Sequence, residues 1–147
     1  MQATVECKPA QPIQEFNFYH EILKRQPKAK ITLSGLPPTV NHAYRKRKGA
    51  GMFMTKDCRA WIEGAVIEAR QGYRKRKPIE GRVAVLVLYR SKSRRRWDLD
   101  NRSKALLDAL THAGVWVDDS QIDHLDIHRK IDGQQDKPET IVWIWEV

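Results

Sequence analysis

The stretch Val83-Ala84-Val85-Leu86-Val87-Leu88-Tyr89 decides the fold class of this chain, because it is almost entirely apolar. Such a run suits a strand that is covered on both faces, which is the usual state of a central strand in an α/β domain. We therefore expect residues 83–89 to form the clearest strand of a mixed sheet.

On the N-terminal side of this strand, the pattern predicts a short strand, a loop and a helix. Lys30–Leu33 reads as the strand, and residues 39–54 are polar, basic and glycine-containing, which indicates a loop. Thr55 can cap a helix that runs to about Arg70. The buried side of that helix would carry Cys58, Trp61, Ile62, Ala65, Val66 and Ala69.

On the C-terminal side, a helix is expected from about Asp100 to His112, ended by Gly114, a residue typical of the left-handed cap. Its buried side would carry Leu106, Leu107, Ala109, Leu110 and Ala113. Two strands near 124–130 and 140–146 follow, with the Asp132-Gly133 pair in the turn between them. This order predicts one α/β (α+β) domain over residues 31–147, with helices flanking a mixed sheet.

Residues 1–30 are expected to form an N-terminal extension. Within it, apolar positions are spaced like one face of a short helix that Pro27 ends; they are Ile13, Phe16, Tyr19, His20 and Leu23. We expect this helix to pack on the main domain or on a partner subunit.

The composition favours a globular protein without a membrane span, since no stretch approaches the roughly 20 apolar residues that a span requires. The first residues lack the basic start and apolar core of a signal peptide, so the expected location is the cytoplasm. Two cysteines, Cys7 and Cys58, make neither a disulfide framework nor a zinc site, and Cys58 is expected to be a buried thiol.

The charge of the chain is unevenly distributed. Residues 1–97 hold 22 Lys/Arg against 7 Asp/Glu, whereas residues 98–147 hold 5 against 11, within a net charge of +9. A basic excess of this size indicates a polyanionic partner, usually nucleic acid, although a solubilising charged surface explains the composition as well. The acidic half supplies what a divalent-metal site would need.

The segment that carries chemistry is Arg94-Arg95-Arg96-Trp97-Asp98-Leu99-Asp100-Asn101-Arg102-Ser103-Lys104. In extended chain, Asp98 and Asp100 project to the same side and can share a cation. Their hard oxygen ligands favour Mg²⁺ or Mn²⁺, and Lys104 lies one helical turn further on. The alternative is that the aspartates only cap a helix.

A second acidic pair, Asp118-Asp119, follows the apolar segment 115–117. The preceding helix and a short return could bring this pair back towards Asp98 and Asp100, and converging carboxylates would suit a nuclease metal site. The alternative is an ordinary turn formed with Ser120.

Residues 94–122, RRRWDLDNRSKALLDALTHAGVWVDDSQI, resemble the signature of the RusA family of Holliday junction resolvases. The resemblance extends more loosely over residues 31–147 and includes Pro37-Pro38-Thr39-Val40-Asn41-His42-Ala43-Tyr44. It implies that Asp98, Asp100 and Asp119 are catalytic, metal-binding positions and that Lys104 is the catalytic lysine.

The resemblance also implies a homodimeric, Mg²⁺-dependent endonuclease that resolves four-way DNA junctions by paired cuts, with no small-molecule cofactor and no membrane partner. The expected DNA contacts are Asn41, Tyr44, Arg45, Lys46, Arg47, Lys48, Arg94, Arg95 and Arg96. Two alternatives stay open: a dimeric DNA-binding protein without catalysis, and a nuclease that acts more broadly on flaps or forks.

Overall fold

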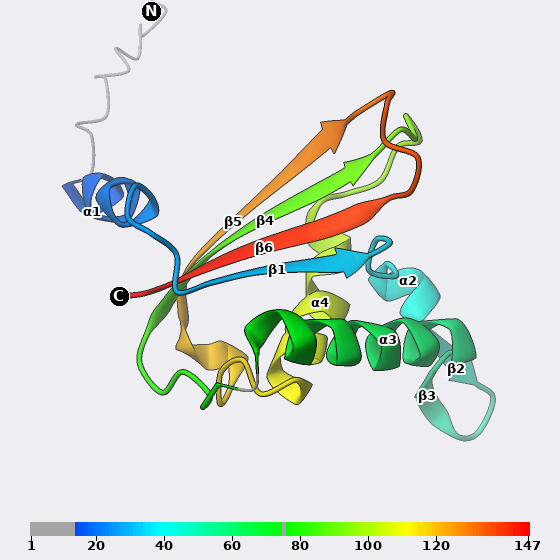
Figure 1. The fold of residues 1–147 in the computed structure, drawn as a ribbon. Coiled ribbons are helices and arrows are strands. Elements are labelled where there is room, and N and C mark those ends of the chain that lie inside the picture. The colour runs from blue at the N-terminus through cyan, green and yellow to red at the C-terminus, as the bar shows by residue number, and fades with distance from the viewer. Residues whose placement is uncertain (1–13, 75) are drawn as a thin grey trace, which may run out of the picture.

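A four-stranded mixed sheet forms the centre of the fold in the computed structural model, which describes residues 14–74 and 76–147 (Figure 1). Its strand order is β1-β6-β4-β5, with β4 parallel to β5 and the other neighbours antiparallel. The strands are β1 (Ala29–Ser34), β4 (Val83–Ser91), β5 (Ile122–Ile131) and β6 (Glu139–Glu146). The α/β class expected from the sequence is confirmed.

Strand β4 lies inside the sheet, as its apolar sequence predicted. Val83, Val85 and Val87 alternate along one face and are fully buried, whereas Ala84 packs into a separate small cluster on the opposite face. Because successive side chains of a strand point to opposite faces, both faces of β4 are covered at this end.

Two helices cover the first face of the sheet: α3 (Lys56–Tyr73) and α4 (Ser103–His112) (Figure 1). Thr55 caps α3 by accepting a hydrogen bond from the Cys58 amide at 3.3 Å, as expected. The helix runs one turn further than predicted, because Tyr73 is still buried before Arg74 turns left-handed with φ of 55°. Gly114 follows α4 with φ of 76°, which confirms its role in ending the helix.

The core side of these helices is close to the predicted one. In α3, Cys58 and Ile62 are buried with two of the alanines, and burial raises the pKa of the Cys58 thiol. In α4, Leu107 and the residue after the helix, Ala113, are only partly buried, whereas Ala105 is buried and was not predicted.

The segment predicted as one loop over residues 39–54 is ordered, so that prediction was wrong. It contains a short helix, α2 (Val40–Ala43), and a two-stranded hairpin of β2 (Tyr44–Arg47) and β3 (Gly51–Met54), which lies apart from the main sheet beside the start of α3 (Figure 1). Gly49 and Gly51 have positive φ angles of 82° and 73°, which allow the tight turn between β2 and β3. The surrounding basic residues made this segment look like a loop in the sequence.

A helix does form in the N-terminal extension: α1 (Gln14–Leu23), with Ile13, like Cys7, outside the described residues. Among residues 18–23 of this helix, Ile22 is buried and packs with Ala84 and Trp145 on the second face of the sheet, and Tyr19 stacks on His124 at 4.5 Å. His20 is exposed, so its predicted place on the apolar face was wrong. No helix among the described residues is long and apolar enough to cross a membrane.

Candidate metal and nucleic-acid site

The segment 92–100 leaves the end of β4 and is held there by Trp97. The Trp97 ring meets Tyr89 edge-on, with centroids 5.6 Å apart, and two guanidinium groups lie over the ring, those of Arg102 at 4.6 Å and Arg129 at 4.8 Å from its centroid. Each of these cations is attracted to the ring by a cation–π interaction. The packing therefore fixes the residue that immediately precedes Asp98.

Hydrogen bonds tie the same segment to the sheet. Arg129, on β5, donates from Nη2 to the carbonyl oxygens of Ser93 at 3.1 Å and Arg95 at 2.9 Å. Arg102 donates to the Pro37 carbonyl just after β1. The path of the chain into the aspartates is thus set by contacts with two distant parts of the sequence, β5 and the segment that follows β1.

This cluster is rich in hydrogen-bond donors, and within the described residues Arg102 and Arg129 form no ion pair with a carboxylate. Arg102 Nε, Arg129 Nε and the Tyr89 hydroxyl are buried without a hydrogen-bond partner among the described residues. Burial lowers the pKa of Arg102 and raises the pKa of Tyr89. The cluster therefore adds positive charge beneath the exposed Arg94–Arg96 run.

Asp98 and Asp100 are both exposed and lie at a turn. Leu99 between them is helical, with φ of −61° and ψ of −42°, and Asp100 begins the short 3-10 turn η1 (Asp100–Arg102). The expectation of extended chain at this pair was therefore wrong. Asp98 accepts a hydrogen bond from the Asn101 side-chain amide at 3.2 Å, and no ion pair of the described residues includes either aspartate.

Lys104 follows in the first turn of α4, exposed, with its Nζ 3.5 Å from Asp108. Because the lysine of this pair is exposed and the distance is long, the contact holds the ammonium group only weakly. Asp100 lies four residues earlier in the chain, at the start of η1.

Asp119 lies at the other end of α4, in the turn η2 (Asp119–Gln121) that leads into β5. Gln121 fixes this turn by accepting from the amides of Val117 and Asp118 and donating to the carbonyls of Ile79 and Gly81, all at 2.8 Å.

The neighbouring Asp118 caps the same turn. Its carboxylate accepts from the Ser120 amide at 3.1 Å, and hydrogen bonds from Ser120 lower its pKa. Both aspartates are exposed, but the Asp118 carboxylate is engaged in capping this turn, whereas the Asp119 carboxylate has no side-chain hydrogen bond or ion pair among the described residues.

The acidic pair Asp98 and Asp100 and the acidic pair Asp118 and Asp119 do not come together within one chain. Tyr89, whose ring contacts Trp97, pairs with Arg129 at one end of the β4–β5 ladder. Val83 pairs with Ile122, which follows the η2 turn of Asp119, at the other end. Six residue steps along a strand separate these levels by about 20 Å. Accordingly, residues 14–74 and 76–147 contain no group of three His, Cys, Asp or Glu side chains that could hold a metal ion. The expected return of Asp118-Asp119 towards Asp98 and Asp100 was wrong for a single chain.

The basic residues expected to contact DNA occupy two exposed places. Arg94–Arg96 precede Trp97, and Arg45–Lys48 lie on β2 and in the hairpin turn. Asn41 is exposed on α2, and Tyr44 is partly buried at the base of the hairpin. Because α2 contacts both η1 and α4, the hairpin stands on the same side of the molecule as Asp98 and Asp100.

Sequence reasoning missed the supporting residues Trp97, Arg102 and Arg129. A tryptophan inside a charged segment was a usable signal, since a large ring there must find a packing surface. Arg129 gave no such signal, because an arginine in a strand is usually a solvated edge residue.

An exposed carboxylate pair beside arginines is the arrangement expected of an enzyme that acts on phosphodiesters. Comparison with known proteins identifies the family. Residues 35–144 match the family model described as endodeoxyribonuclease RusA. The chain belongs to the RusA endodeoxyribonuclease family and is therefore a nuclease.

Individual relatives agree with this assignment. The crossover junction endodeoxyribonuclease rusA of Enterobacteria phage 82 is 33% identical over 92 residues, covering 58% of this chain and 70% of that protein. The RusA protein of Aquifex aeolicus is 29% identical over 102 residues, covering 69% and 80%. That of Escherichia coli strain K12 is 66% identical over a short stretch of 29 residues, which spans 24% of its length.

Proposed function

We propose that this protein is a homodimeric, Mg²⁺-dependent endodeoxyribonuclease that resolves four-way DNA junctions by two symmetric cuts. The observation that carries the proposal is the exposed Asp98–Asp100 pair, which no cation of the described fold neutralises although three arginines precede it. The names of the relatives, crossover junction endodeoxyribonucleases, support the choice of substrate.

The donor set fits a hard divalent cation, because carboxylate oxygens are the ligands that Mg²⁺ and Mn²⁺ prefer. Asp98 and Asp100 would hold it together with Asp119. Since Asp119 lies at the opposite end of the sheet from the Asp98 and Asp100 of its own chain, the third carboxylate would come from the second copy in the dimer. When bound, the ion would neutralise charge on the scissile phosphate and lower the pKa of an attacking water.

The other residues of the site would act on the phosphate directly. Lys104 would place an ammonium group where negative charge develops during phosphodiester cleavage. Arg94–Arg96 and Arg45–Lys48 would bind flanking phosphates, which position the DNA without reading its sequence and make affinity fall steeply with salt.

A dimer suits both the site and the substrate. Two copies related by a two-fold axis contribute the same residues reciprocally, so a shared site appears twice. A four-way junction has approximate two-fold symmetry, and two opposed cuts release two duplexes.

The test is cleavage of a synthetic mobile four-way junction, compared with a linear duplex of one arm, in Mg²⁺ and in EDTA. We expect paired cuts in opposite strands of the junction, only with Mg²⁺, and an intact linear duplex. Binding of the junction without cutting in any divalent ion would favour the alternative, a DNA-binding protein without catalysis. Equal cutting of flaps and forks would favour a broader branched-DNA nuclease.

A further inference from the structure

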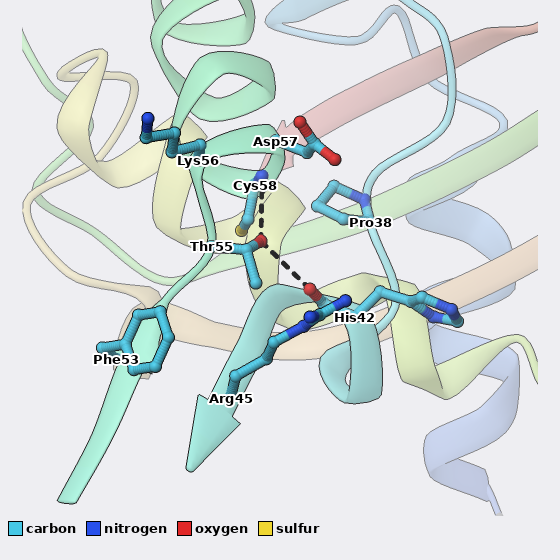
Figure 2. A pocket seen from close by; sticks show the side chains of 8 residues that line it. All are labelled: Pro38, His42, Arg45, Phe53, Thr55, Lys56, Asp57 and Cys58. Carbon is cyan, nitrogen blue, oxygen red and sulfur yellow. Dashed lines mark hydrogen bonds between the residues drawn. The ribbon is translucent and has the colours of Figure 1, made fainter. Parts of the chain in front are cut away.

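A hollow of about 370 Å³ lies between the β2–β3 hairpin and the beginning of α3 (Figure 2). Figure 2 shows Arg45 and Phe53 on the hairpin at one side of this hollow and Thr55, Lys56 and Cys58 of the α3 start at the other. Pro38, His42 and Asp57 complete its lining. None of the chemistry assigned to Asp98, Asp100 and Lys104 uses this hollow.

The walls of the hollow are fixed to one another. The Thr55 hydroxyl donates to the His42 carbonyl at 3.0 Å, and the Thr55 amide donates to the Ala43 carbonyl at 2.8 Å. Cys58 beneath them is buried, and Thr39 Oγ1 lies 2.7 Å from His42 Nδ1. The hollow is therefore formed before any ligand arrives, which reduces the entropy lost on binding.

An aromatic ring forms part of its wall and remains open to solvent. Phe53 is 45% exposed and Met52 beside it is 67% exposed. Phe53 pairs with Arg45 across the hairpin, so both side chains lie on the same face of the two strands. A ring beside a cation is the arrangement by which proteins stack an exposed base and hold its phosphate.

The charge around the hollow favours a polyanion. Residues 44–54 carry four cationic side chains, Arg45–Lys48, and no acidic one. Lys56 adds a cation at the start of α3, and Asp57 is the single acid among the lining residues. An apolar surface for another protein would not require this concentration of positive charge.

We propose that this hollow binds one nucleotide of branched DNA that has left the base stack, with Phe53 stacked on the base and Arg45 and Lys56 on its phosphate. A base inside a continuous duplex is covered on both faces by its neighbours, so a phenylalanine stacks on it only at the cost of unstacking the duplex, whereas a base at a branch or in a single strand is already accessible. The contact of α2 with η1 and α4 places the hollow beside the proposed cleavage site. The inference rests on the proposed function, because it takes branched DNA as the substrate.

The test compares Phe53→Leu and Phe53→Trp with a matched control, Phe18→Leu, because Phe18 is a similarly exposed phenylalanine on α1. Binding to a four-way junction, a single-stranded oligonucleotide and a linear duplex is measured in EDTA, so that cleavage does not interfere. We expect Phe53→Leu to weaken binding of the junction and the single strand about tenfold, the usual effect of losing one stacked base. Its affinity for the linear duplex should stay native, as should all affinities of Phe53→Trp and Phe18→Leu.

A second measurement locates the base. 5-Iodouracil placed at the branch point should form a photochemical crosslink to Phe53, and the same base in the middle of an arm should not. An equal loss of affinity for junction and duplex, native affinity of Phe53→Leu for all three DNAs, or equal crosslinking at both positions would overturn the proposal. If the native protein does not cut junctions while Phe53→Leu still loses junction and single-strand binding, the catalytic function fails and the nucleotide site stands.

Discussion

The two ends of β4 use the same residue types in opposite ways. At the end where β4 begins, Asp118 caps a turn and Gln121 satisfies four backbone groups, so each of these polar groups has a partner inside the fold. At the end where β4 finishes, Asp98 and Asp100 are exposed, and within the described structure neither forms an ion pair; Asp98 accepts one hydrogen bond, from the neighbouring Asn101 side chain.

Proximity to the end of the strand does not explain this difference. Arg90, in the same strand, is paired with Asp132 at 3.1 Å and Glu139 at 2.6 Å. Acids that stabilise the fold are thus matched within it, whereas Asp98 and Asp100 remain available to a ligand. The comparison teaches that the partners of an acidic group, rather than the density of acids, separate a candidate site from a structural cluster.

The largest effect on cleavage is expected at the end where β4 finishes, beside Asp98 and Asp100. Asp100→Asn removes a negative charge from the proposed metal site, and we expect cleavage of the four-way junction to fall more than about a hundredfold. Binding of the junction should remain, because the arginines are untouched. Single-turnover cleavage and gel-shift binding measure the two effects, with Glu63→Gln, an exposed acid on α3, as the control.

A similar loss of cleavage is expected from Asp119→Asn, although this residue lies at the other end of the sheet, where β4 begins. If the second copy supplies Asp119, mixing the inactive Asp100→Asn and Asp119→Asn proteins must restore cutting, because each mixed dimer then contains one intact site. Such dimers should cut one strand rather than two. An inactive mixture, after subunit exchange has been verified, would mean that Asp119 acts within its own chain or has no role.

Asp118→Ala serves as the matched comparison for Asp119. Because Asp118 caps η2, we expect this variant to melt at a lower temperature while its cleavage rate stays close to native. Loss of cleavage without loss of stability would reverse the assignment of the two neighbouring aspartates.

A smaller effect on cleavage is expected from Arg129, which holds the segment that leads to Asp98 and Asp100. Arg129→Lys cannot both contact the Trp97 ring and donate to two carbonyl groups, so the aspartates should shift. We expect cleavage to slow about tenfold or more and to require a higher Mg²⁺ concentration, with unchanged junction affinity. Arg82→Lys, in an exposed pair with Asp123, is the control, and equal behaviour of the two variants would show that Arg129 does not position the site.

The smallest effect concerns pH. Burial raises the pKa of Tyr89 above its ordinary value of about 10, so above that pH the unfolded chain loses the phenolic proton more readily than the folded one. Stability should therefore fall as pH rises beyond 10, and Tyr89→Phe should remove part of this fall. Because the hydroxyl has no hydrogen-bond partner among the described residues, the variant should differ by less than about 1 kcal/mol at neutral pH. Denaturant unfolding at several pH values measures both.

Local chemistry explains which features could be predicted. The apolar run of β4, the Thr55 cap and Gly114 act through their own backbone or immediate neighbours, and each has its expected role. The β2–β3 hairpin was missed because basic side chains conceal a turn that depends on two glycines. The packing of Trp97 with Arg129 was missed because the two residues lie far apart in the sequence.

The sequence by itself determined the order of the elements, the family, and the identity of the acidic and basic groups. Only the tertiary structure decided where those groups lie relative to one another. The reason is the parallel pairing of β4 with β5: the chain must cross from the end of one strand to the start of the next through α4. Residues that follow β4, such as Asp98, and residues that precede β5, such as Asp119, are thereby placed at opposite ends of the sheet.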